Sequence, residues 1–589
     1  MNSEEKKFLA TTAIEEFWDT SKPIVFLGER CRLYRRRSFW EPLKGVVLPS
    51  PWEDKERLYA AFKYVDDFYE CMLPILADKL NTIHGVNFGK KYWRILIGPW
   101  LFHYVHVLYD RYLSLKGALN KYPNLVTIGL SEESFVIPQD YNEFIKLISD
   151  DSYNLQLYTK ILDLLGEKSQ KKSYKVTQKY IESEKEDKRS FKSYLYQFIK
   201  KFFHEFFVNK KTLLIFNPYF TSDFGKKILE KERENVRLLV DKKVDCKSIL
   251  IDLEMRKKLK TFDCNLEGFE PIFNGMLPFD LPLIYLEGYP KLKKEVEKDY
   301  PVNPKAIFSA NAWYSNEYFK QLAAISSEKE TILIGTQHGG IYGIHNYMAV
   351  EKHELAITDQ YYSWGWEQLD CAAKVIPFFA NKMAGVKEMS ANNKNEDILF
   401  MVTSMPRYFF RFQYFNSDAF INYINEQFSF VDMLDSNRKH NLRVRLYFID
   451  FDWGCSDRLK DMFPEIILED MTVPFLERIN NCRLVVLDHL FTSFMEVMAL
   501  NKPVISFAKT YQLKSEARVI FDELRNVGIL YDSPKDAAMA INSIYIDVET
   551  WWNDSKRQAA RKKFCNYFAR VSSESDEKWI EEFERLIKN

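Results

Sequence analysis

The sequence has few cysteines and no motif that would pair them. Its eight cysteines lie scattered over 589 residues, and none forms a Cys-x-x-Cys pair. This spacing argues against a structural zinc site and against a disulfide framework. We therefore expect a protein of the reducing cytoplasm.

An excess of charge and a long apolar run are also missing. Lysine plus arginine and aspartate plus glutamate number 83 each, so no overall field would attract nucleic acid. No stretch approaches the ~20 apolar residues that span a bilayer, and the charged residues 1–7 include no apolar signal core. These absences predict a protein without a nucleic-acid partner that is soluble or at most peripheral to a membrane.

What the sequence does contain is a large apolar and aromatic fraction. Hydrophobic residues make up 46% and aromatic residues 16% of the chain, which excludes general disorder and favours a well-packed, enzyme-like body. The length predicts two or three domains. Strand and helix patterns alternate at intervals suited to parallel sheets, and residues 384–396 carry little that could enter a core.

We therefore divide the chain into three parts. Residues 1–385 are predicted to form an N-terminal Rossmann-like domain with helical insertions at about 52–125 and 150–210. Residues 396–560 are predicted to form a second Rossmann-like domain, and 561–589 a helix that packs back on the first. Within 186–211, aromatic residues recur at helical spacing with lysines between them. That pattern suits a helix on an anionic membrane surface and equally a helix packed on a domain wall.

The segment Thr331–Gly343 is the first candidate for a ligand site. It predicts a short buried strand that breaks into a glycine-rich loop carrying Gln337, His338, Gly339 and Gly340. Backbone amides can approach a ligand at such glycines, and open α/β sheets bind ligands where their strands end. A tight turn with a packed histidine would give the same pattern.

The second candidate is the segment 482–507. It predicts a buried strand, a polar turn with His489, a helix opened by Thr492 or Ser493, and another buried strand begun at Pro503. Free amides and two hydroxyls at a helix N-terminus suit a phosphate group. Glu496 could complete a capping box or accept hydrogen bonds from a ribose.

Further charged residues follow other predicted strands. Glu29 follows the strand 23–28, Ser404 and Arg407 follow the strand 398–402, and Arg443 lies in the strand 442–449. Two metal sites are conceivable, one from His103, His106 and Asp110 on one helix face, and one from Asp450 and Asp452 after a strand. Packed histidines and a plain loop are the alternatives.

The two ligand-site segments together resemble the C-terminal halves of the two domains of GT-B glycosyltransferases. They are most similar to bacterial surface-polysaccharide transferases, through Gln-His-Gly at 337–339 and the Asp…Thr-Ser…Glu…Ala-Leu…Lys-Pro-Val-Ile pattern over 488–505. More narrowly, the runs 93–101, 110–112 and 335–343 resemble an uncharacterised family of transferases associated with loci for surface carbohydrates, including nonulosonic acids.

This resemblance implies an α/β protein with two Rossmann-like domains facing across a cleft. A nucleotide sugar would lie mainly on the C-terminal domain and a glycan or lipid-linked glycan acceptor on the N-terminal one, without metal or cofactor. By role, the residues it implies are Thr492 and Ser493 for the phosphate, with Arg407 or Arg443 adding charge, and Glu496 for the ribose. His338, Gly339 and Gly340 would bind a sugar carboxylate or assist the leaving group, and Gln337, Ser404 and His489 complete the donor-binding residues. The base would be Glu29 in preference to Asp110.

The implied donor is a CMP-linked ulosonic acid of the Kdo or sialic-acid type, used for lipopolysaccharide or capsule at the cytoplasmic face of the membrane. A CDP-polyol or UDP-hexose donor is the alternative within the same class. A noncatalytic nucleotide-binding scaffold of a polysaccharide assembly complex, and a metal-dependent sugar enzyme using Asp450 and Asp452, remain open.

Overall fold

A computed structural model of the chain describes most of its residues. The described part runs from residue 6 to residue 588, apart from 176–207, 261–267, 389–394 and several short stretches at 221–223, 226, 229–234, 240–247, 386–387, 414–415 and 470, with single described residues inside 240–247. The predicted membrane-surface helix at 186–211 falls almost wholly outside the described residues. No helix among those described is long and apolar enough to cross a bilayer.

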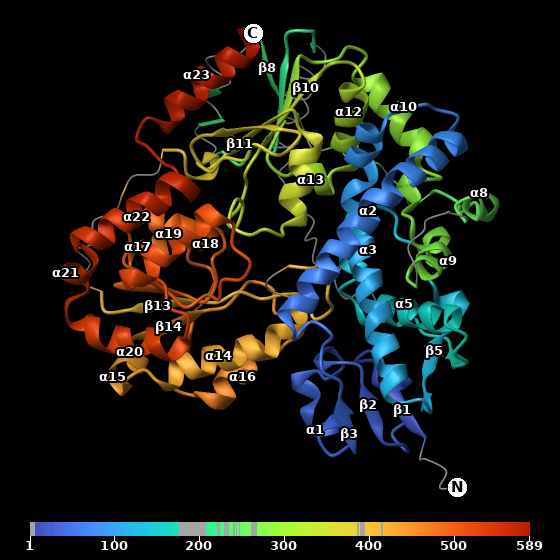
Figure 1. The fold of residues 1–589 in the computed structure, drawn as a ribbon, viewed down its shortest axis with the longest axis horizontal. Helices are drawn as coiled ribbons and strands as arrows, with labels where there is room; N and C mark the ends of the chain where they lie inside the picture. The colour runs from blue at the N-terminus through green and yellow to red at the C-terminus, as the bar shows by residue number, and fades with distance from the viewer. Residues whose placement is uncertain are drawn as a thin grey trace, which may run out of the picture.

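The chain begins with a small parallel sheet of its own (Figure 1). Its strands, in the order β3-β2-β1-β4, are β1 Lys7–Ala10, β2 Ile24–Phe26, β3 Gly45–Val47 and β4 Leu125–Val126. The strand expected at 23–28 therefore belongs to this separate sheet, and the loop with Glu29 follows it there. Nearby lie α1 Arg37–Trp40, β5 Ile128–Leu130 and β6 Gln170–Lys172.

Two long helices form the middle of the molecule, as the helical insertion predicts. α2 spans Lys55–His84 and α3 spans Lys90–Lys121, and the two pack against each other. The Asp54 side chain accepts hydrogen bonds from two free amides at the start of α2, and Gly85 ends the helix in a left-handed conformation with φ 64°. α3 is apolar on every side and is buried on every side, since it also contacts α5, α12 and α13.

The second sheet has six parallel strands. In the order β12-β11-β10-β9-β7-β8, it contains β7 Leu213–Phe216, β8 Val236–Leu238, β9 Ala306–Ser309, β10 Ile332–Thr336, β11 Gln360–Ser363 and β12 Lys374–Pro377. Among the described residues, the helices between α3 and β12 are α4 Tyr141–Leu147, α5 Asp151–Leu164, α8 Leu253–Lys257, α9 Glu270–Asp280, α10 Tyr289–Asp299, α11 Ala312–Ser315, α12 Glu317–Ser327 and α13 Ala349–Ile357.

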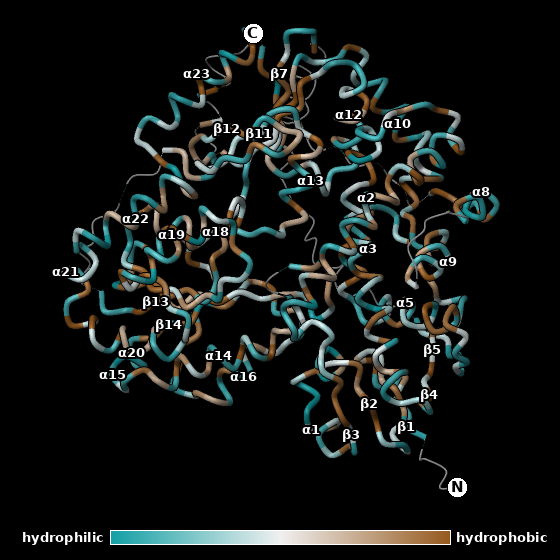
Figure 2. Tube along the Cα trace, in the orientation of Figure 1, coloured by the Kyte–Doolittle hydropathy of each residue, from teal (hydrophilic) through white to brown (hydrophobic). Residues whose placement is uncertain are grey.

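The third sheet has five parallel strands in the doubly wound order β15-β14-β13-β16-β17. They are β13 Ile398–Met401, β14 Leu442–Arg445, β15 Ile467–Leu468, β16 Leu484–Leu487 and β17 Val504–Ser506. Strands β13, β16 and β17 are apolar and buried, and the hydrophobic colour of β13 is visible in Figure 2, whereas β14 alternates Leu442 and Val444 with two arginines. The helices around this sheet are α14 Phe420–Asp432, α15 Ser436–Asn441, α16 Cys455–Met462, α17 Phe475–Asn480, α18 Thr492–Ala499, α19 Ser515–Asn526, α20 Pro534–Ile544 and α21 Val548–Trp552.

The chain ends by crossing back to the six-stranded sheet. α22 Ser555–Phe568 packs on α18 and α19 of the third sheet. α23 Ser575–Lys588 then lies against the six-stranded sheet, where Trp579 and Phe583 pack on Phe308 and Tyr362 (Figure 1). The two C-terminal helices therefore link the five-stranded sheet, through α22, to the six-stranded sheet, through α23.

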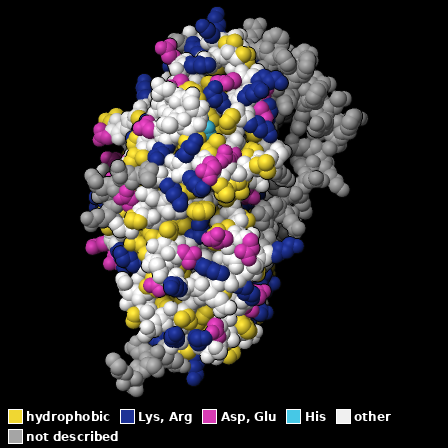
Figure 3. Space-filling model, turned by 90° about the vertical axis from the view of Figure 1, so that its right-hand side faces the viewer, with side chains coloured by type: hydrophobic (Ala, Val, Ile, Leu, Met, Phe, Trp, Pro, Cys, Tyr) yellow, Lys and Arg dark blue, Asp and Glu magenta, His cyan; other side chains and the backbone are white. Residues whose placement is uncertain are grey.

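Charges and thiols are distributed without concentration. On the face in Figure 3, lysines and arginines alternate with aspartates and glutamates, in keeping with zero net charge. Six cysteines are free thiols, namely Cys31, Cys246, Cys371, Cys455, Cys482 and Cys565. Cys71 on α2 is disulfide-bonded, which the scattered spacing did not predict.

Candidate active site between the two large sheets

A groove of about 650 Å³ separates the six-stranded and five-stranded sheets. Its walls are loops that follow strands: the loop after β10 on one side, and the loops after β13, β14 and β16 on the other. The carboxyl ends of both parallel sheets therefore open on one space, and β13 and β16 flank the point where the strand order of the third sheet reverses. This arrangement confirms the expected two-domain, GT-B-type architecture.

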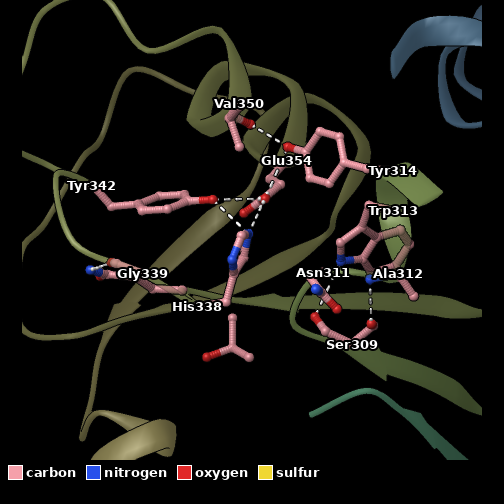
Figure 4. Close-up of polar contacts among 12 residues, drawn as sticks. Ser309, Asn311, Ala312, Trp313, Tyr314, His338, Gly339, Tyr342, Val350 and Glu354 are labelled. Atoms are coloured by element: carbon pink, nitrogen blue, oxygen red, sulfur yellow. Dashed lines mark hydrogen bonds and ion pairs between the residues drawn. The ribbon is translucent and has the colours of Figure 1, made fainter. Parts of the chain in front are cut away.

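His338 enters the groove from the loop after β10 (Figure 4). Its Nε2 lies 3.1 Å from Oε1 of Glu354 on α13 and 2.7 Å from the hydroxyl of Tyr342. Because a carboxylate only accepts hydrogen bonds, we assign the proton to Nε2. Nδ1 is then unprotonated, and it has no hydrogen-bond partner in the described part of the chain.

Glu354 is held by hydroxyl groups as well as by His338. It is fully buried and accepts hydrogen bonds from Tyr314 at 2.9 Å, Tyr342 at 3.0 Å and Tyr361 at 2.8 Å. Burial, together with this carboxylate, raises the pKa of Tyr342 well above its usual value, so the hydroxyl keeps its proton and donates it. Glu354 therefore fixes the orientation of His338, and the sequence analysis missed it because α13 reads as an ordinary helix.

Gln337 has a structural role. Its amide oxygen accepts from the backbone NH of Trp364 at 2.9 Å and from Nε1 of Trp366 at 2.8 Å, and its Nε2 donates to the carbonyl of Gly339 at 2.8 Å. It is fully buried and does not line the groove. The expectation that Gln337 contacts a ligand is therefore not met here, since the neighbouring tryptophans use its amide group.

Gly339 and Gly340 lie where the loop after β10 meets the start of α18. The Gly340 amide donates to Oγ1 of Thr492 at 3.0 Å, and a Cβ at position 340 would stand 2.5 Å from the carbonyl carbon of Phe491. Only glycine fits there, because a side chain would push the walls apart. The Gly340 amide and the Thr492 hydroxyl, both expected at a ligand, bond to each other across the groove.

The tip of α18 supplies the opposite wall. Nε2 of His489 lies 2.9 Å from Oγ of Ser493, and its Nδ1 lies 2.9 Å from Oδ1 of Asp488. Oδ2 of Asp488 accepts from Nε2 of Gln427 at 2.9 Å. The carboxylate places the ring proton on Nδ1, so Nε2 accepts from the Ser493 hydroxyl, which leaves that oxygen at the positive end of the helix.

Glu496 lies one turn into α18 and forms an ion pair across the groove. Its Oε1 is 3.0 Å from Nζ of Lys382, a residue that precedes the third sheet. Burial raises the pKa of Glu496 above its usual value, and Lys382 offsets part of that shift. The expected ribose partner is therefore engaged by a lysine that the sequence analysis did not single out.

Cations reach the groove from positions other than those expected. Arg407 is buried, pairs with Asp151 and lines a different cavity. Arg443 lies at the amino-terminal end of β14 and pairs with Asp397 at 3.4 Å, away from the groove. The two expectations fail for different reasons. Arg443 stands at the amino-terminal end of β14, opposite the groove. Arg407 follows the carboxyl end of β13, but its side chain pairs with Asp151 and the carbonyl of Arg30 instead of reaching the groove.

The groove cations are Arg411, Arg445 and Lys382. Arg445 lies 3.8 Å from a carboxylate oxygen of Glu469. Arg411 donates from Nε to the side-chain oxygen of Gln413 at 2.7 Å, and within the described residues no carboxylate lies within 4 Å of it. Burial lowers the pKa of its guanidinium, which marks a charge without a counter-ion.

Of the three remaining predicted site residues, only Ser404 lines the groove. Ser404 lines the groove, with its hydroxyl 3.4 Å from the carbonyl of Asp450. Glu29 lies in a cavity of about 250 Å³ beside the first sheet and pairs with Arg32 at 2.6 Å. Asp110 is fully buried in an ion pair with Arg111 at 2.5 Å and accepts from Trp52. Neither predicted base contacts the groove.

The residues of the two conceivable metal sites have other partners. Nδ1 of His103 lies 3.0 Å from the carbonyl of Pro99, and Nδ1 of His106 accepts from the amide of Phe412 at 2.9 Å. Asp450 accepts from the amides of Gly454 and Cys455 at the start of α16. In the described part of the chain, no group of three or more His, Cys, Asp or Glu side chains is placed to hold a metal ion.

Sequence comparison identifies the family. The profile of the LIC12162 family transferases matches residues 7–583. The chain belongs to this family. No curated protein matches the chain. In this LIC12162 family member, the matched span includes all three sheets and the whole groove.

Solved structures that this family member is similar to are distant. S. aureus TarM, in complex with UDP among other ligands, is 12% identical over 54% of this chain and 59% of its own, with a TM-score of 0.33. Acinetobacter baumannii MurG is 8% identical over 64% and 99%, also with a TM-score of 0.33. UDP-GlcNAc 2-epimerase from Neisseria meningitidis is 11% identical over 60% and 98%, with a TM-score of 0.33. The chain thus spans 59% of the length of TarM.

Proposed function

We propose that this transferase moves a sugar from a nucleotide donor to a glycan acceptor in the groove between its two large sheets. The observation that carries the proposal is the meeting of the His338 loop and the α18 tip in one groove, joined by the Gly340–Thr492 hydrogen bond. One wall offers a helix N-terminus for a phosphate, and the other offers an oriented imidazole within the same space.

The donor phosphate is proposed to bind at the tip of α18. The first amides of the helix donate to the phosphate, and the Ser493 hydroxyl, which donates to Nε2 of His489 in the structure, rotates to donate its proton to a phosphate oxygen instead. Glu496 turns from Lys382 to the ribose hydroxyls, while Lys382 remains near the leaving charge. Binding through a helix dipole and fixed cations stabilises the departing phosphate without a metal ion.

The transferred sugar is proposed to be an acidic one, a CMP-linked ulosonic acid. Arg411 supports this choice, because a partly buried guanidinium that no described carboxylate approaches within 4 Å is matched by a carboxylate on the substrate. The phosphate already has its own site at α18. A second anion beside Arg411 is expected for a donor that carries a carboxylate on the sugar.

His338 is proposed as the general base. Its Nδ1 removes the proton from the acceptor hydroxyl, whose oxygen bonds to the anomeric carbon as the carbon–oxygen bond to the phosphate breaks. The bonding electrons leave with the nucleotide phosphate, and Glu354 stabilises the imidazolium that forms. This role replaces the earlier candidates Glu29 and Asp110, whose side chains do not line the groove.

Two alternatives remain distinct proposals. A CDP-polyol or UDP-hexose donor would use the same helix tip but would leave Arg411 without a sugar carboxylate. A noncatalytic scaffold of lipopolysaccharide or capsule assembly at the cytoplasmic face of the membrane would bind nucleotide without turnover. The oriented His338 favours an enzyme, since binding alone does not require a buried carboxylate behind an imidazole.

Thermal unfolding with CMP, CDP, UDP and GDP tests the donor site. A nucleotide at a hundredfold excess over its Kd stabilises the folded state by about 2.7 kcal/mol. We expect CMP to give the largest shift, and Ser493→Ala to remove most of it, because a hydrogen bond to a charged group contributes about 1.5–3 kcal/mol. Ser515→Ala, at the tip of α19, is the matched control and should keep the shift. An unchanged shift in Ser493→Ala would contradict the proposed site.

A further inference from the structure

A second cavity lies on the other side of the loop that follows β16. It has a volume of about 440 Å³ and is formed by the start of α2, one side of α14 and the loop after β17. His489 and Phe491 line both this cavity and the groove. The second cavity is large enough for a small-molecule ligand, for which about 300–1,000 Å³ is usual.

The two spaces carry opposite charge. The groove is lined by the cations Lys382, Arg411 and Arg445 and by one carboxylate, Glu496. The second cavity is lined by four carboxylates, those of Glu53, Glu426, Asp488 and Asp532, and by two ammonium groups, those of Lys55 and Lys509. An anionic nucleotide is therefore attracted to the groove, whereas the second cavity disfavours it.

The lining of the second cavity suits hydroxyl-rich rings. Tyr511 and Phe491 offer partly exposed aromatic faces, and Asn422 and Thr510 offer neutral hydrogen-bonding groups. Carboxylates accept hydrogen bonds from sugar hydroxyls, and aromatic faces pack on the C–H groups of a pyranose. These groups together match an uncharged sugar better than a phosphate or a peptide.

The second cavity also adjoins the proposed reaction centre. The Gly340 amide contacts Thr492, and the backbone of Gly340 packs directly on the carbonyl of Phe491. The loop that carries His338 therefore touches the same segment that walls the second cavity. His489 and Phe491 line both spaces, so they are the residues that a ligand reaching from the second cavity into the groove would pass.

We propose that the second cavity binds the acceptor, as an uncharged oligosaccharide whose terminal sugar extends past Phe491 into the groove. The site lies between the start of α2 and the five-stranded sheet, so it is not on the six-stranded sheet where the resemblance would put the acceptor. This inference rests on the proposed sugar transfer. It adds a separate binding site and the charge class of its ligand.

Two asparagines on α14 give a matched test. Asn422 lines the second cavity, and Asn425 is exposed one turn along the same helix. Asn422→Trp fills the cavity without removing an ion pair, and Asn425→Trp places the same side chain in solvent. Lactose, maltotriose and chitotriose are titrated against each protein by saturation-transfer difference NMR, and CMP binding is followed by thermal shift.

We expect at least one of these sugars to bind the wild type and Asn425→Trp, and to bind Asn422→Trp at least about tenfold more weakly. The CMP shift should be equal in all three proteins. The proposal is overturned if none of the sugars binds, if Asn422→Trp binds them as the wild type does, or if Asn422→Trp loses CMP instead. Failure of the donor site itself is separate, because it would appear as a CMP shift that does not respond to Ser493→Ala.

Discussion

Two histidines line opposite walls of the groove, and they differ in where their carboxylate partner comes from and in how many ring nitrogens are hydrogen-bonded. His338 receives its carboxylate from a different element, Glu354 on α13, and its Nδ1 has no hydrogen-bond partner in the part of the chain that the structure describes. His489 receives its carboxylate from the preceding residue, Asp488, and both of its ring nitrogens are engaged. The two histidines therefore have different roles. His338 can take a proton from a ligand, whereas His489 positions the Ser493 hydroxyl at the start of α18.

The largest expected effect comes from removing the open nitrogen of His338. His338→Gln should lower kcat for transfer by about 10²–10⁴-fold, the usual contribution of a general base. The nucleotide shift should survive, because the α18 tip is intact. The rate of transfer is measured as the initial rate of CMP release from CMP-sialic acid or CMP-Kdo in the presence of acceptor. Nucleotide binding is measured as the shift in unfolding temperature that CMP produces.

The same two assays on His489→Gln allow the roles of His338 and His489 to be compared. Here the nucleotide shift should fall along with the rate, since the Ser493 hydroxyl loses its partner. His440→Gln, on an exposed histidine of α15, controls for loss of a histidine as such. Equal loss of the nucleotide shift in the His338 and His489 variants would erase the distinction between the two walls.

A smaller effect is expected at Arg411, on the groove between these walls. Arg411→Gln should weaken a donor with a sugar carboxylate by about 1.5–3 kcal/mol, because it removes a hydrogen bond between two charged groups at a partly exposed position. Binding of CMP alone should change little. The measurement is the ratio of Kd values for CMP-sialic acid and CMP in wild type and variant.

Arg518→Gln, an exposed arginine on α19, is the control for loss of a positive charge. If Arg411→Gln weakened CMP and CMP-sialic acid by the same factor, Arg411 would belong to the phosphate site. A UDP-hexose or CDP-polyol donor would then gain support over the ulosonic acid.

The two walls could be read from sequence because each is a continuous segment. A buried strand, a glycine loop and a helix N-terminus lie within 331–343 and 482–507, so local pattern predicts both the fold and the ligand edge. The two large sheets follow from the same patterns. The first, four-stranded sheet could not be predicted from such patterns. Its strand β4 pairs with β1 from more than a hundred residues away, and each strand of this sheet has four residues or fewer.

Residues that reach the groove from elsewhere could not be found in this way. Glu354 and Lys382 have no motif of their own, and their importance exists only through contacts with His338 and Glu496. Gln337 was predicted to contact a ligand because it follows a strand at the ligand edge of the sheet. The sequence pattern does not show that tryptophans such as Trp364 bind its side-chain amide instead. Strand position could have corrected one choice, since Arg445 stands at the carboxyl end of β14 and Arg443 does not.

The smallest effect tests the ion pair that joins the two walls. Because burial raises the folded pKa of Glu496 above its reference value of 4.5, its contribution to stability is present below that value and is lost as pH rises through the folded pKa. Glu496→Gln cannot ionise and avoids this loss. Its Tm relative to wild type should therefore rise by about 1 °C between about pH 4 and about pH 7, because an effect below about 1 kcal/mol moves the Tm of a large chain only slightly.

Lys382 limits the size of this effect and decides its interpretation. The lysine side chain is 38% exposed, so its pairing with Glu496 contributes at most about 1 kcal/mol and offsets only part of the burial cost. Glu330→Gln, at an exposed turn, should show no change with pH. A Tm difference for Glu496→Gln that stays constant with pH would mean that Lys382 fully compensates the buried carboxylate.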